Sequence, residues 1–222
     1  MANNDDSQEQ AQADAGNNRD PATIRVGGDA WHWNSYPDAY FQASTQLFNA
    51  LQDRGDWNRL AKPLLFLQRH TLEITIKETL HICEAAIVAR GGTPPVRKQN
   101  PSHDLRQTQK ELRDAMRAAG VEQDWPTDLD HLVDEFVKID AAGGASTDTK
   151  INASRLRYST TQLGAPSFSS PFYVDIRDIQ NRLWRLLFAT VENGRSFVFT
   201  LQAEATSAKF SAECAESNND EQ

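Results

Sequence analysis

Cysteine and long apolar runs are both scarce in this chain. Of its 222 residues two are cysteines, Cys83 in an apolar stretch and Cys214 in a polar one, so we expect no structural disulfide and a reducing compartment. Apolar runs extend over only a few residues, far fewer than the roughly 18 that a membrane span needs. The opening residues have neither the basic nor the apolar region of a secretory signal. These absences predict a cytoplasmic protein that does not enter a membrane.

The signatures of several enzyme classes are missing as well. The chain contains no P-loop, no Gly-x-Gly-x-x-Gly after a strand, no Gly-x-Ser-x-Gly elbow and no His-Glu-x-x-His pair. Its five histidines are scattered singly, and two distant cysteines cannot form a zinc ribbon. We therefore expect neither a metal site nor a cofactor.

The net charge of −8 comes from the two ends of the chain. The first 20 residues hold five acidic side chains and one arginine, and the last ten hold four acidic side chains and no base. Between them 22 acidic and 22 basic residues remain (31 − 9 and 23 − 1), which argues against nonspecific coating of nucleic acid. Both ends also have almost no large apolar groups, so we predict acidic, disordered tails at 1–22 and 204–222 around a folded domain at 23–203.

Helical periodicity dominates the folded part. Apolar residues three, four and seven positions apart predict helices over five stretches, at about 38–55, 63–90, 103–120, 129–144 and 174–194. We expect Pro63 in the first turn of the second helix, Ser102 as the cap of the third, and Thr127 or Asp128 as the cap of the fourth. Residues 195–202 fit a short strand or a last helical turn. The fold class predicted is therefore all-α, an up-and-down bundle of about five helices.

The second of these stretches, 63–90, is the most apolar, yet it carries four ionisable residues in its middle. His70, Glu73 and Lys77 are spaced three and four apart and so share one face, with Arg69 beside them. One interpretation is a solvated stripe that contributes only a few tenths of a kcal/mol. The other is a groove-facing cluster that is satisfied by side chains from other helices, which would need a compensating role.

Three segments of the chain stand out together, namely PLLFLQRHTLEITIKETL, SHDLRQTQKEL and KINASRLRYS. They resemble a group of uncharacterised bacterial HEPN-like proteins, and the likeness covers roughly residues 36 to 190. It implies a helical bundle, often a homodimer, with a link to RNA or nucleotide chemistry in toxin–antitoxin and antiviral defence systems. On this resemblance the candidate catalytic residues are His70 and His103, and the candidate binding residues are Arg69, Glu73, Lys77, Arg97, Asp104, Arg157 and Tyr158.

Two departures from the family pattern concern catalysis. Ser159 follows Arg157-Tyr158 where the pattern has proline. HEPN ribonucleases also resemble one another in a motif on a late helix, in which an arginine is followed by four to six residues and then a histidine. The comparable spacing here, from Arg97 to His103, lies in a proline-containing loop. Whether the chain is an enzyme therefore stays open at the level of sequence.

Metal-independent cleavage of RNA needs a base, an acid and a cation. Histidine can transfer protons at cellular pH, and arginine can clamp a phosphate through two hydrogen bonds. His70 or His103 could transfer the protons. Arg69, Arg97 or Arg157 could bind the phosphate. The first hypothesis is accordingly a HEPN-type ribonuclease or nucleotide-handling protein that acts as a dimer.

The second hypothesis is a non-catalytic module that binds a partner protein of a defence complex, encoded nearby. The missing late-helix motif and the acidic tails favour it, because such tails suit partner capture. In this hypothesis Arg69, Glu73 and Lys77 set the register of the bundle.

Overall fold

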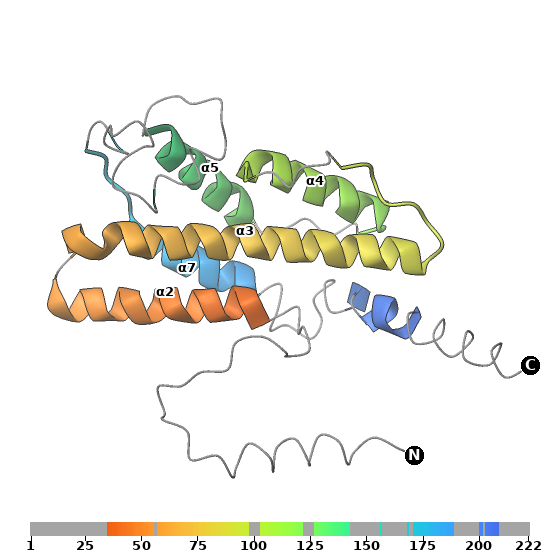
Figure 1. Cartoon of the computed structure of the whole chain (residues 1–222), viewed down its shortest axis with the longest axis horizontal. Coiled ribbons are helices and arrows are strands. Elements are labelled where there is room, and N and C mark those ends of the chain that lie inside the picture. Colours follow the sequence, from red (N-terminus) through yellow and green to blue (C-terminus); the bar gives the residue numbers. More distant parts are fainter. Residues whose placement is uncertain are drawn as a thin grey trace, which may run out of the picture. The chain divides into compact units, whose positions relative to one another are not determined.

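The computed structural model describes five long ranges and a few further residues of the chain. These are residues 35–55, 57–97, 103–121, 127–142 and 171–188, with Leu156, Phe168 and residues 200, 201 and 203–208. They belong to the second of two compact units, His32–Gln222. The long helices among the described residues are α2 (Ser35–Arg54), α3 (Trp57–Ala89), α4 (Leu105–Ala118), α5 (Thr127–Ala142) and α7 (Ile176–Leu187) (Figure 1). No strand occurs in the described ranges, and the predicted all-α class is confirmed.

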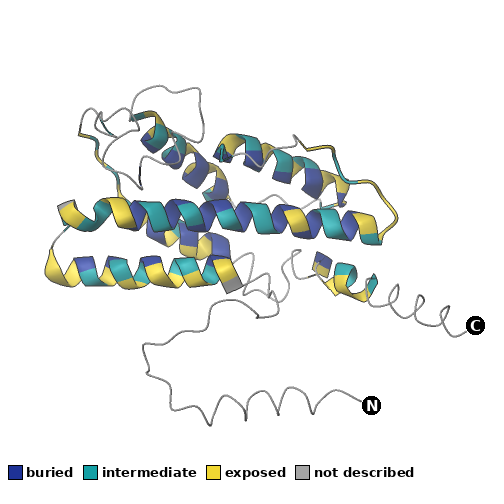
Figure 2. Ribbon diagram, viewed as in Figure 1, coloured by how far each residue is buried: buried dark blue, intermediate teal, exposed yellow. Residues whose placement is uncertain are grey.

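Helix α3 is the centre of the bundle, because it packs against α2, α4 and α7. Figure 1 shows α2 running back along its first half and α4 lying along its second half, while α5 contacts α4 and α7. Leu72, Ile76, Leu80, Cys83 and Ile87 recur every three or four residues and are almost completely buried. This repeat appears as the dark blue bands along α3 in Figure 2. A helix that is covered from several sides can be apolar over most of its circumference.

The start of α3 differs from the prediction. The helix begins at Trp57, and Pro63 lies inside it rather than in its first turn. Proline removes one hydrogen bond of the helix ladder, but Arg59, whose carbonyl loses this partner, is exposed, so water can bind that carbonyl group. Although α3 spans 33 residues, it is not apolar enough to cross a membrane, and neither is any other helix in the part of the chain that the structure describes.

The start of α4 also differs from the prediction, which placed the cap at Ser102. The cap is Asp104, whose carboxylate accepts hydrogen bonds from the backbone N–H groups of Arg106 and Gln107. Aspartate is as good a cap as serine, and its negative charge also suits the positive end of the helix dipole. Ser102 lies outside the described residues. The cap at Asp104 places His103 immediately before the first turn of α4.

The folded part extends beyond residue 203, where the sequence analysis set its end. Residues 203–208 are helical, as are Thr200 and Leu201. Leu201 is buried in the main core, and Glu204 accepts two hydrogen bonds from Arg90 at the end of α3. One buried leucine and one ion pair attach this mostly polar helix to the bundle.

Candidate functional site

Five ionisable residues from three parts of the bundle meet beside the middle of α3. Arg69, Glu73 and Lys77 lie on successive turns of α3, His103 precedes α4, and Asp140 comes from the last turn of α5. We call this group the charged cluster. The polar face of α3 is thus directed at other elements of the bundle, as the second interpretation of the sequence requires.

Arg69 is the buried cation of the charged cluster. Its guanidinium donates to Oε2 of Glu73 at 2.9 Å and to Oδ2 of Asp140 at 3.2 and 3.3 Å. A further N–H donates to the backbone carbonyl of His103 at 3.0 Å. The residue is only 4% exposed, so these bonds replace its contacts with water. Arg69 therefore joins α3 to the start of α4 and the end of α5.

Oε1 of Glu73 binds two groups that reach the surface. Nζ of Lys77 donates to it at 2.6 Å, and Nδ1 of His103 lies 2.8 Å away. A carboxylate accepts hydrogen bonds, so Nδ1 of His103 carries a proton in this contact, and in the neutral ring Nε2 presents its lone pair on the far side. The His103 side chain is 40% exposed, whereas that of Glu73 is 5% exposed. A buried carboxylate thus orients a histidine that water or a ligand can reach.

The ionisation of Glu73 is set by opposing effects. Burial raises the pKa of this carboxyl, but the hydrogen bond and charge of Lys77, the charge of Arg69 and the bond to His103 together lower it below the ordinary value. Glu73 is consequently a stable anion at neutral pH. A stable anion can hold an imidazole in one tautomer and stabilise its protonated form.

A second buried polar group lies on the neighbouring face of α3, and it contains no charge. Nε2 of Gln68 donates to Oε1 of Gln180 on α7 at 2.8 Å, and Oγ of Ser44 on α2 donates to the same oxygen at 3.3 Å. Nε2 of Gln180 in turn donates to Oγ1 of Thr45 at 2.8 Å. We call these four residues the amide cluster. It joins α2, α3 and α7 as the charged cluster joins α3, α4 and α5.

Three other predicted site residues form contacts of a different kind. His70 contacts two aromatic rings, Tyr40 of α2 with centroids 4.5 Å apart and Phe66 at 5.6 Å. Arg97 pairs with Glu84, about 16 Å along the axis of α3 from Glu73 at 1.5 Å per residue. Asp104 caps α4.

Arg157 and Tyr158 lie outside the described residues. The structure therefore brings together four of the predicted residues, Arg69, Glu73, Lys77 and His103.

Asp140 was missed by the sequence analysis. It lies in the last turn of α5, where a negative charge is unfavourable because the carbonyl end of the helix dipole is also negative. An acidic residue at such a position needs a cation from elsewhere, and Arg69 supplies it. This mismatch with the dipole is the signal that could have identified Asp140.

The chemistry available at the charged cluster is proton transfer next to a cation. His103 has an oriented and accessible imidazole, and Lys77 holds an ammonium group on the same carboxylate oxygen, with its side chain 32% exposed. Within the described ranges, no group of three or more His, Cys, Asp and Glu side chains is arranged to hold a metal ion.

Comparisons with known proteins do not assign the chain. No family model matches it, and neither the curated proteins nor the solved structures include a significant match.

Proposed function

We propose that this chain is a HEPN-like protein that binds RNA at the charged cluster and cleaves it without a metal ion, as part of a bacterial defence or toxin–antitoxin system. The observation that carries the proposal is the 2.8 Å contact between Glu73 and a partly exposed His103. This is the arrangement of a general base whose orientation is fixed by a buried carboxylate. The family is inferred from the sequence motifs, and the site from the geometry.

In the proposed reaction, Nε2 of His103 removes the proton of a ribose 2′-OH. The 2′-oxygen then attacks the adjacent phosphorus, and the bond from phosphorus to the 5′-oxygen breaks. A protonated imidazole gives its proton to the departing 5′-oxygen, which leaves a 2′,3′-cyclic phosphate and a 5′-hydroxyl group. Lys77 stabilises the negative charge that develops on the phosphorane, and Glu73 stabilises the imidazolium that forms on His103.

The acid in this scheme comes from His103 of a second copy of the chain. Within one chain the second predicted histidine, His70, packs with the rings of Tyr40 and Phe66 on the α2 side of α3. A two-fold dimer would place two copies of one residue across a shared groove, where one acts as base and the other as acid. The proposal therefore includes a homodimer.

Incubation of the purified protein with a mixed RNA pool and excess chelator tests the reaction. We expect cleavage to a 2′,3′-cyclic phosphate by the wild type, and a loss of about 100-fold or more in His103→Ala, the contribution of one general base. His131→Ala is the matched control, because His131 is exposed on α5. Cleavage that is equal in His103→Ala and the wild type would refute the assignment.

A second candidate function, the non-catalytic partner-binding module, is favoured by the state of Arg69. Its guanidinium is occupied by Glu73, Asp140 and a backbone carbonyl, as in a purely structural ion-pair network. In this case the wild type would leave RNA intact and would capture the product of a neighbouring gene. Equal capture by a chain truncated at both acidic tails would assign the binding to the bundle.

A further inference from the structure

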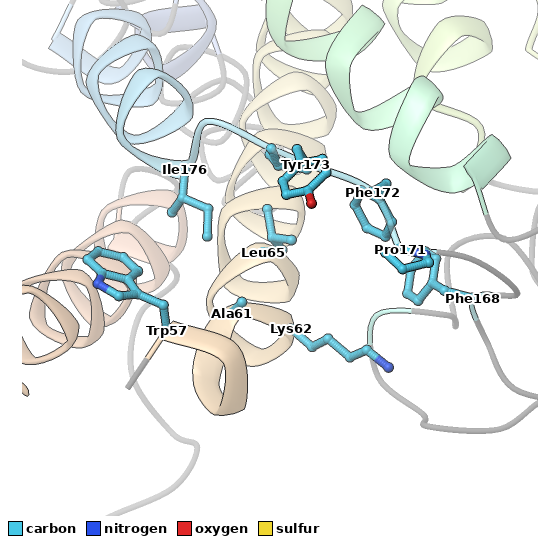
Figure 3. Close-up of a pocket in the computed structure, with 10 residues that line it drawn as sticks. Trp57, Ala61, Lys62, Leu65, Phe168, Pro171, Phe172, Tyr173 and Ile176 are labelled. Carbon is cyan, nitrogen blue, oxygen red and sulfur yellow. The ribbon is translucent and has the colours of Figure 1, made fainter. Parts of the chain in front are cut away.

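A groove of about 560 Å³ lies between the first turns of α3 and the segment that leads into α7 (Figure 3). It is separate from the charged cluster. Trp57 and Lys62 come from α3, Phe172 and Tyr173 precede α7, and Phe168 and Ile176 complete the part of the wall used here. Its volume falls within the roughly 300–1,000 Å³ of pockets that hold small molecules.

The wall of the groove is unusually aromatic for a surface that faces water. Tyr173 is 98% exposed, and the rings of Phe168 and Phe172 lie 4.9 Å apart beside it. Trp57 stands on the opposite side, as Figure 3 shows. Flat side chains on two sides of an open groove provide faces against which a planar apolar group can stack.

Lys62 is the single fully charged residue in the lining. Its ammonium group lies 5.3 Å from the centroid of the Phe168 ring, and Figure 3 shows the side chain extending toward that ring. Among the described residues Lys62 forms no ion pair with a carboxylate, in contrast to Lys77 and Lys138. The ring therefore holds the cation at the edge of the groove while its charge stays available to an anion.

We propose that this groove is a binding site for a small amphipathic anion, with a flat apolar body and one carboxylate, sulfonate or phosphate group. The body would stack between Trp57 and the aromatic residues before α7, and the anionic group would pair with Lys62. This proposal goes beyond the ribonuclease proposal and does not depend on it. A strand of RNA is a poorer fit, because successive phosphates need several cations and this lining supplies one.

Two fluorescent probes of similar shape test the proposal. The first, 8-anilinonaphthalene-1-sulfonate, has a flat apolar body and one negative charge, and the second, N-phenyl-1-naphthylamine, has the same body without the charge. We expect the full-length protein to bind the sulfonate at one site and Lys62→Gln to weaken that binding about 5-fold, the effect of one partly exposed charge pair. Binding of the neutral probe should be unchanged in Lys62→Gln.

Two further variants locate the site. Ala61→Trp fills the groove from α3 and should weaken the binding of both probes. Lys138→Gln, far along the chain on α5, should leave the binding of both probes unchanged. Circular dichroism and the unfolding midpoint show that each variant is folded, and exposed Lys62 can be changed without opening the core. Failure to bind the sulfonate, or an equal loss in Lys62→Gln and Lys138→Gln, would overturn the proposal. Displacement of the sulfonate by a short single-stranded RNA that also loses affinity in Lys62→Gln would overturn it in favour of nucleic acid.

Discussion

Two polar clusters lie beside each other on α3, and they differ in charge and in access to water. The amide cluster around Gln68 and Gln180 is neutral and closed, whereas the charged cluster around Arg69 and Glu73 opens to the surface through Lys77 and His103. Both replace water with hydrogen bonds between helices. Only the charged cluster presents groups that can exchange protons with a ligand. The amide cluster can position helices, whereas the charged cluster can also take part in a reaction.

The two clusters also differ in the free energy that it costs to bury them. A buried neutral group needs hydrogen bonds, but a buried charge needs a counter-charge as well, and removal of one partner leaves the other uncompensated. The two clusters should therefore respond differently when single members are replaced.

Replacement of Arg69 should have the largest effect. Arg69→Met keeps most of the side-chain volume but leaves Glu73 and Asp140 without their shared cation, so we expect a loss of about 3–5 kcal/mol in the free energy of unfolding. Urea unfolding at neutral pH measures it. Arg113→Met is the control, since Arg113 pairs with Asp130 at the exposed surface and such pairs contribute about 0–1 kcal/mol. If Arg69→Met loses no more unfolding free energy than Arg113→Met, Arg69 is not the shared cation that stabilises the charged cluster.

Replacement of Gln180 should cost less, and the cost should be insensitive to pH. Gln180→Leu removes its hydrogen bonds to Gln68, Ser44 and Thr45, for an expected loss of about 1–3 kcal/mol. The same loss should be measured at pH values on both sides of neutrality, because no member of the amide cluster titrates. A loss that changes strongly with pH would mean that the amide cluster is coupled to a charge.

Glu78 is a carboxyl group on the same helix as Glu73, but its pKa is shifted in the opposite direction. Burial raises the pKa of Glu78 from 4.5 to about 8. Because the folded-state pKa lies above the unfolded value, the contribution of Glu78 to stability is most favourable below about pH 4.5 and is lost as the pH rises toward 8. Glu78→Gln should be neutral near pH 4 and should stabilise by roughly 1–2 kcal/mol at pH 8, since water reaches part of the side chain.

The measurement for Glu78 is the unfolding midpoint as a function of pH, with Glu135→Gln as the control. Glu135 pairs with Lys138 on the surface of α5. If the unfolding midpoints of the wild type and Glu78→Gln change with pH in parallel, the pKa of Glu78 is not raised in the folded protein.

Lys77 should have the smallest effect. Because the pKa of Glu73 is lowered, its ionised form stabilises the fold above about pH 4.5, and this contribution is lost as the pH falls through the lowered value. Lys77→Met removes one cause of the lowering, so its acid unfolding should begin at a higher pH, with a loss below about 1 kcal/mol at pH 7. Identical acid transitions in the variant and the wild type would show that Lys77 does not act on Glu73.

Local signals in the sequence predicted the bundle well. The three- and four-residue apolar spacing located the five helices, and Gly55, with a φ of +68°, ends α2 as expected. The prediction of the exact helix ends was wrong where two signals in the sequence compete. Pro63 is acceptable both in a first turn and at an exposed position inside a helix, and both Ser102 and Asp104 are good caps.

The candidate site was only half predictable. Spacing on one helix put Glu73 and Lys77 on one face with Arg69 beside them, because neighbours on a helix face are determined by local geometry. The same spacing put His70 on that face, but its ring packs against Tyr40 and Phe66. The contact to His103 was an expectation from the resemblance. Asp140 lies 71 residues from Arg69, and such a contact depends on how helices pack, which a single sequence does not encode locally.

The tautomer of the neutral His103 ring tests whether Glu73 orients this histidine as a base. If Glu73 orients His103, two-dimensional ¹⁵N–¹H spectra of the neutral side chain, at about pH 8.5, should show the proton on Nδ1 and a bare Nε2. The exposed His131 provides the internal reference on α5, and Glu73→Gln should remove the Nδ1–H preference of His103. A wild-type His103 with its proton on Nε2, like a solvated histidine, would contradict a carboxylate-oriented base at this site.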